Sequence, residues 1–102
     1  MTFELVIWPE AELDLIEDYD WYEERLKGLG VELIQKVDER LASIQENPHK
    51  YQKVHKQIRR VLTHRFPYSI YYLINQDKIF VIAIMHTASN PRKWKRRIKT
   101  AF

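Results

Sequence analysis

The residues of this sequence that are best suited to chemistry are one histidine and the run of cations that follows it. Residues 78–85 form a run that is apolar after Lys78 and rich in β-branched side chains, His86 follows it, and residues 87–99 are strongly basic. An imidazole titrates near neutral pH, so His86 is a candidate proton donor or anion contact. The alternative is a histidine whose hydrogen bonds are satisfied by its local backbone.

The densest basic cluster lies just beyond this histidine and interleaves one aromatic residue. Its members are Arg92, Lys93, Trp94, Lys95, Arg96, Arg97 and Lys99. Cations neutralise phosphates and an aromatic ring can stack on a base, so we predict that residues 92–97, together with Arg60, bind the target or a nucleic acid. In the alternative, Trp94 covers the core while the cations stay solvated.

A second set of cations flanks a predicted strand in the middle of the chain. The set that can line one groove beside His86 is Arg59, Arg60, Arg65, Lys53 and Lys56. Two considerations weaken this groove. Arginines on an edge strand also protect it from aggregation, and strand alternation sends Arg59 and Arg60 to opposite faces.

The charge is divided unequally along the chain. The formal net charge is +3, but residues 1–46 hold 13 acids and 4 bases, whereas residues 47–102 hold 1 acid and 13 bases. The basic half favours an anionic partner. The acidic face of the first predicted helix is interpreted as a solvated surface formed by Glu10, Asp14, Glu17, Asp18 and Glu24.

Composition excludes several classes of site. The 102 residues suit a single domain spanning 1–102, and the absence of cysteine excludes a disulfide or a thiolate metal site. There is no paired-histidine zinc spacing, and the only glycines, Gly28 and Gly30, cannot build a phosphate loop. We therefore expect no metal and no cofactor. With no secretory signal and no long apolar run, we expect a cytoplasmic protein that does not enter a membrane.

The hydrophobic pattern predicts an α+β fold in the order β-α-α-β-β-β. We expect a strand over 3–8, a helix from Pro9 to about residue 27, a second helix over 29–46, and strands over 58–64, 68–74 and 78–85. Residues 49–57 are predicted to be a loop and 87–99 a basic tail. The helical hairpin should pack on one face of a small, mainly antiparallel sheet, because neither layer can bury its apolar face alone.

The run 78–85 is predicted to be buried on both faces and to form the centre of the sheet. By strand alternation His86 should share a face with Phe80, Ile82 and Ile84 and emerge at the end of the sheet. Pro91 then prevents further strand pairing.

The ordered set of motifs resembles the RelE/ParE superfamily, the toxins of bacterial toxin–antitoxin pairs that are often labelled plasmid stabilisation proteins. The resemblance covers nearly the whole chain. It is carried by Asp18-Tyr19-Asp20-Trp21-Tyr22, Asn47-Pro48, Arg59-Arg60, Arg65-Phe66-Pro67-Tyr68 leading into Tyr72, and His86 followed by Asn90-Pro91-Arg92-Lys93-Trp94. It implies a small toxin that a cognate antitoxin neutralises by wrapping it, as a toxin–antitoxin hetero-oligomer.

The resemblance implies two alternative targets. RelE-like members cut messenger RNA in the ribosome without a metal, whereas ParE-like members poison DNA gyrase and have no known catalytic residues of their own. Ser69 stands where RelE-like nucleases carry an arginine, and Trp94 stands about where they carry a tyrosine. Ser89 replaces a common ParE-like arginine.

We therefore expect a ParE-like toxin that acts by binding, with DNA gyrase as the favoured target. The alternative is a ribosome-dependent mRNA endonuclease in which Lys53, Arg59 and Arg65 clamp phosphate and His86 transfers a proton. A third possibility is a non-toxic relative that only binds its antitoxin.

Overall fold

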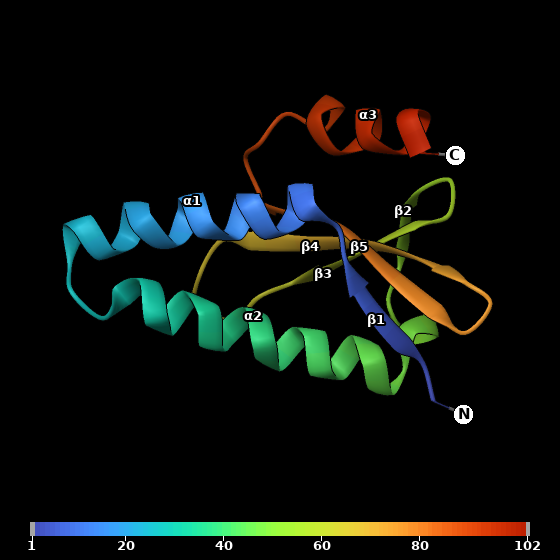
Figure 1. Ribbon diagram of the computed structural model, residues 1–102, viewed down its shortest axis with the longest axis horizontal. Coiled ribbons are helices and arrows are strands. Elements are labelled where there is room, and N and C mark those ends of the chain that lie inside the picture. The colour runs from blue at the N-terminus through green and yellow to red at the C-terminus, as the bar shows by residue number, and fades with distance from the viewer. Residues whose placement is uncertain (1, 102) are drawn as a thin grey trace.

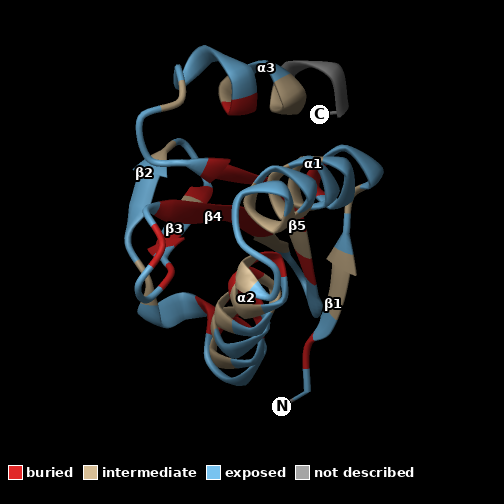
Figure 2. Cartoon of the chain, turned by 90° about the vertical axis from the view of Figure 1, so that its left-hand side faces the viewer, coloured by how far each residue is buried: buried red, intermediate tan, exposed pale blue. Residues whose placement is uncertain are grey.

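Three helices cover the two faces of one five-stranded sheet (Figures 1 and 2). The computed structural model describes residues 2–101, with side chains in the last helix as far as Ile98. The elements are β1 (Glu4–Ile7), α1 (Pro9–Arg25), α2 (Leu29–Glu46), the 3-10 turn η1 (Pro48–Lys50), β2 (Lys53–His55), β3 (Ile58–Leu62), β4 (Tyr68–Asn75), β5 (Lys78–His86) and α3 (Arg92–Ala101).

The sheet has the order β1-β5-β4-β3-β2, with β1 parallel to β5 and every other pair antiparallel. The predicted α+β class and the helical hairpin are confirmed. Two segments differ from the prediction. The predicted loop 49–57 contains the end of η1 and all of β2, and the basic tail forms the helix α3.

The hairpin between α1 and α2 depends on both glycines. Gly28 adopts a φ of 93°, a left-handed conformation that costs glycine little. A Cβ at Gly30 would lie 2.6 Å from the carbonyl oxygen of Tyr19, so the two helices can approach only because this residue lacks a side chain. The Glu23 carboxylate accepts hydrogen bonds from the amides of Gly28, Gly30 and Val31. These bonds lower the pKa of Glu23 and satisfy amides at the start of α2 that have no partner within the helix.

The sheet separates two hydrophobic clusters of unequal size. On one face the helical hairpin packs through Leu33, Val37 and Ile44 against strand residues that include Tyr72 and Val81. On the other face a smaller cluster is closed by α3, and its members are Ile58, Tyr71, Leu73, Ile82, Ala83, Met85 and Trp94. Figure 2 shows the buried strands between α3 on one side and the hairpin on the other.

Two predictions about β5 were wrong. The central strand is β4, because β5 has only β1 on its other side and that pairing ends at Val81. The face assignment of His86 was also wrong, because the register with β4 shifts between Tyr71 and Tyr72 and leaves Ile82 as an extra residue. Phe80 and Ile82 therefore face α3, whereas Ile84 faces the hairpin, and alternation puts His86 on the side of Ile84.

Among the described residues, no helix combines the length and apolar character needed to cross a membrane.

Candidate functional site

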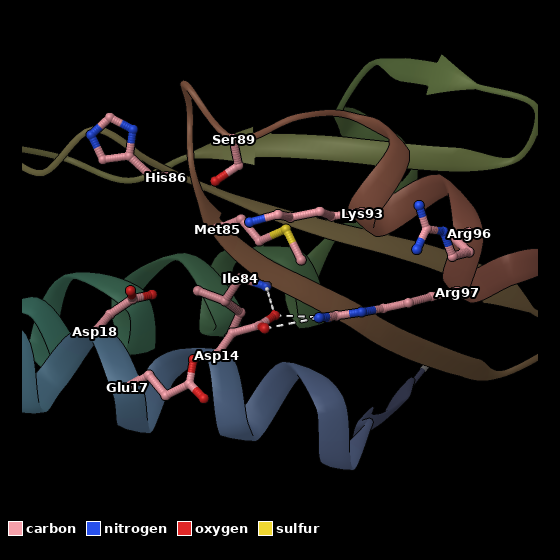
Figure 3. Close-up of a pocket in the computed structure, with 10 residues that line it drawn as sticks. All are labelled: Asp14, Glu17, Asp18, Ile84, Met85, His86, Ser89, Lys93, Arg96 and Arg97. Atoms are coloured by element: carbon pink, nitrogen blue, oxygen red, sulfur yellow. Dashed lines mark hydrogen bonds and ion pairs between the residues drawn. The ribbon is translucent and has the colours of Figure 1, made fainter.

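Beyond Val81 an ion pair, instead of a strand, forms hydrogen bonds with the outer edge of β5. The amide of Ile84 donates to Asp14 Oδ2 over 3.1 Å, and Arg97 Nη1 donates to the carbonyl oxygen of Ile82 over 2.7 Å. The two side chains also bind each other, since Arg97 donates to both carboxylate oxygens of Asp14 at 2.7 and 2.9 Å. This bidentate pair, drawn in Figure 3, occupies the edge that β1 leaves open and ties α1 and α3 to β5.

The pair closes one end of a cleft of about 370 Å³ between α1 and α3. Figure 3 shows acidic side chains from α1 facing basic side chains from α3 across the end of β5. The polar residues that line the cleft are Asp14, Glu17, Asp18, His86, Ser89, Lys93, Arg96 and Arg97. The structure thus brings His86 together with three of the predicted basic residues, and adds three acids that the sequence did not assign to a site.

Asp14 and Asp18 correct the interpretation of the acidic face as simply solvated. The side chain of Asp14 is only 15% exposed in its pair with Arg97, and its hydrogen bond raises the pKa of that guanidinium. Burial raises the pKa of Asp18 to about 6, although a hydrogen bond with Tyr68 opposes the shift. No sequence signal marks Asp14 as a partner of Arg97, because the two lie 83 positions apart.

His86 lies at the exposed end of β5 with its ring against Tyr68, at a centroid distance of 5.5 Å. Its Nδ1 accepts the amide of Ala88 over 3.0 Å. The neutral ring therefore carries its proton on Nε2. One nitrogen of His86 is thus occupied by local backbone, and the other is the atom through which this histidine can donate to a ligand.

The helix α3 docks through Trp94 and Arg97, and Arg92, Lys93 and Arg96 are exposed. The indole stacks on Tyr71 with ring centroids 4.3 Å apart and an interplanar angle of 18°, and Trp94 is 5% exposed. This is the arrangement of the alternative in which Trp94 covers the core. Lys93 and Arg96 reach the cleft beside His86, whereas Arg92 and Lys95 line a second cavity, which Arg96 also lines. The side chain of Lys99 lies outside the described part.

The other predicted cations are distributed over distinct places. Arg65, in the β3–β4 loop, pairs with Glu32 of α2. Arg59 donates to the carbonyl oxygens of His49 and Tyr51 and so holds the η1 segment. With Lys53 it lines a further cavity, while Arg60 lines yet another, which includes Arg40 and Lys50.

The predicted single groove beside His86 does not form. Strand alternation separates Arg59 from Arg60, Arg59 is already engaged by backbone oxygens, and Arg65 is engaged by a carboxylate. Of the four nuclease candidates, only Arg59 and Lys53 share a cavity, and that cavity does not include His86 or Arg65. Among the described residues, no group of three or more metal-binding side chains is assembled.

A helical hairpin on one face of the sheet and a basic helix on the other define a small α+β protein with a cationic surface at the carboxyl end of β5. The chain belongs to the ParE toxin family of the type II toxin–antitoxin system parDE, whose family model matches residues 5–91. This agrees with the resemblance seen in the sequence and with its ParE-like branch.

A solved structure has the same fold. A chain of the chromosomal ParDE toxin–antitoxin system from P. aeruginosa superposes with a TM-score of 0.75 at 18% sequence identity, covering 83% of this chain and 96% of that one. Among curated proteins no relative matches.

Proposed function

We propose that this ParE-family chain is a growth-inhibiting toxin that acts by binding an essential target, with DNA gyrase favoured, and not by cutting RNA. The supporting observation is the contrast between its cations. Lys93 and Arg96 lie together on a helix held by Trp94 and Arg97, whereas the residues needed for RNA cleavage are dispersed over three places. Rigid presentation of charge suits binding, while proton transfer at a phosphate needs groups within hydrogen-bond reach of the same atoms.

A cognate antitoxin is the second partner in this proposal. Its role is to cover the cationic end of the sheet in a cytoplasmic toxin–antitoxin complex, so that the target cannot reach it. The parDE family model and the ParDE neighbour support an antitoxin partner, and the net charge of the basic half favours an acidic covering segment.

Induced expression in a bacterial host tests the proposal. We expect growth arrest with a DNA-damage response and intact transcripts. Lys93→Gln combined with Arg96→Gln should relieve the arrest, and His86→Ala should not. Lys27→Gln combined with Lys78→Gln removes the same charge from exposed residues elsewhere, so this control should keep the arrest.

Other outcomes would overturn the proposal. Rapid transcript cleavage that His86→Ala abolishes would establish the nuclease alternative. Absence of any arrest, with the protein folded and abundant, would identify a non-toxic relative that only binds an antitoxin.

A further inference from the structure

A second cavity lies on the α3 side of the molecule and shares only Arg96 with the cleft at His86. It has a volume of about 450 Å³ and is lined by His55, Lys56, Arg92, Lys95 and Arg96. His55 ends β2, Lys56 lies in the β2–β3 turn, and the others come from the first two turns of α3. Figure 1 shows that turn rising toward α3. Every lining residue is therefore a cation or an imidazole, although the walls belong to segments that are far apart in the sequence.

Three of the cations in this cavity have no counter-charge among the residues that the structure describes. Lys56, Arg92 and Lys95 form no ion pair with any side chain that the structure describes, in contrast to Arg65 and Arg97. Lys56 has a φ of 51°, a left-handed conformation that is uncommon for a residue with a side chain. Like charges held together without a counter-charge repel one another, so a bound anion would relieve that repulsion.

The size and the aromatic packing restrict which anion fits. A volume of this order suits a ligand of nucleotide size. It is too small for an α-helix, which is about 10–12 Å across with its side chains. Trp94 borders this region, with the His55 ring 6.1 Å from its own, but it is buried against Tyr71. The indole is thus not available to stack on a base, while the cations above it are open to phosphate.

We propose that this cavity binds the phosphodiester backbone of a nucleic acid, through Lys56, Arg92 and Lys95, without reading bases. The toxin would thus contact a nucleic acid in addition to its protein target. The biological role of this contact rests on the proposed function. Binding by the purified protein does not depend on that function, because it requires neither gyrase nor toxicity.

Fluorescence anisotropy of a labelled 20-base-pair DNA duplex tests the cavity. We expect Lys56→Gln combined with Lys95→Gln to weaken binding about 10-fold or more. The slope of log K against log [salt] should fall by roughly 2, since each phosphate contact contributes about 0.9. Adding Arg92→Gln should lower the magnitude of this slope by roughly 1 further. Duplexes of unrelated sequence should bind with equal affinity. Lys27→Gln combined with Lys78→Gln loses the same charge outside the cavity and should change the slope little.

Three results would overturn the proposal. Equal weakening by the control pair would mean diffuse attraction to a basic surface. Preferential binding of poly-glutamate over DNA would identify an acidic protein segment as the occupant. Binding of inorganic phosphate with no measurable affinity for the duplex would mean that the cavity takes a free anion only. RNA of the same sequence serves as a further arm that distinguishes the two sources of phosphodiester, and circular dichroism checks the folding of each variant.

Discussion

The two faces of the sheet are covered in different ways, and the difference separates stability from function. On the hairpin face, two long helices bury a continuous apolar cluster that includes the fully buried Leu33 and Ile44. On the other face, one short helix is held by an indole and by a guanidinium, while its remaining side chains are mostly cations. The first layer contains the larger buried apolar cluster and so contributes more of the hydrophobic free energy of folding, whereas the second presents charge.

The largest effect should follow from a cavity on the hairpin face. Leu33→Ala removes a side chain with no exposed surface, and such changes cost about 3 kcal/mol in the free energy of unfolding. Urea denaturation should show this loss across the whole molecule in one transition. A cost below about 1 kcal/mol would mean that the hairpin is not the layer that determines global stability.

Removing the Asp14–Arg97 ion pair at the edge of β5 should have the next largest effect. Asp14→Ala leaves the guanidinium of Arg97 without its anion and the amide of Ile84 without its acceptor. We expect a loss of about 2 kcal/mol, below the full value for a completely buried pair because both side chains are partly exposed. Thermal denaturation should show it, and Glu24→Ala, on an exposed part of the same helix, should change the stability by less than about 0.5 kcal/mol.

Loosening the packing of α3 should disturb one face only. Trp94→Ala removes the indole that stacks on Tyr71, so α3 should pack less tightly on the sheet while the Arg97–Asp14 pair still holds it, with a cost of about 1 kcal/mol to global unfolding. Hydrogen exchange should show lost protection in α3 while β4 and β5 stay protected. Trp94→Phe keeps an aromatic ring and serves as the control. Equal loss of protection in the hairpin would show that the two layers are not separable.

Local sequence patterns predicted the hairpin face more completely than the α3 face. Helix periodicity and the Asn47-Pro48 stop gave the bounds of the second helix, 29–46, as the structure has them. The predicted face of His86 was wrong because one extra residue in β5, Ile82, reverses the alternation of side chains. A register shift of this kind depends on pairing with β4, and strand periodicity does not report it.

The site was predictable in its charge but not in its pairings. The basic character of residues 92–97 was evident, and so was the possibility that Trp94 covers the core. The contacts of Asp14 with Arg97, and of Lys56 with the cavity beside α3, join residues that are far apart in the chain. Such pairs depend on the crossing of helix and strand in three dimensions, so a single sequence carries no local signal for them.

The smallest effect should be the pH dependence that Asp18 introduces on the hairpin side of the cleft. Burial raises its pKa from 3.8 to about 6, so between these values the folded protein holds a proton that the unfolded chain has released. Stability should therefore fall as the pH rises from about 4 to 6, and the penalty should be complete above 6. Asp18→Asn should remove this slope and stabilise the protein at pH 7 by about 1 kcal/mol, an estimate reduced for partial solvent screening. Urea denaturation of both proteins from pH 4 to 8 checks this, and parallel profiles would show that the Asp18 carboxyl is solvated like the exposed acids around it.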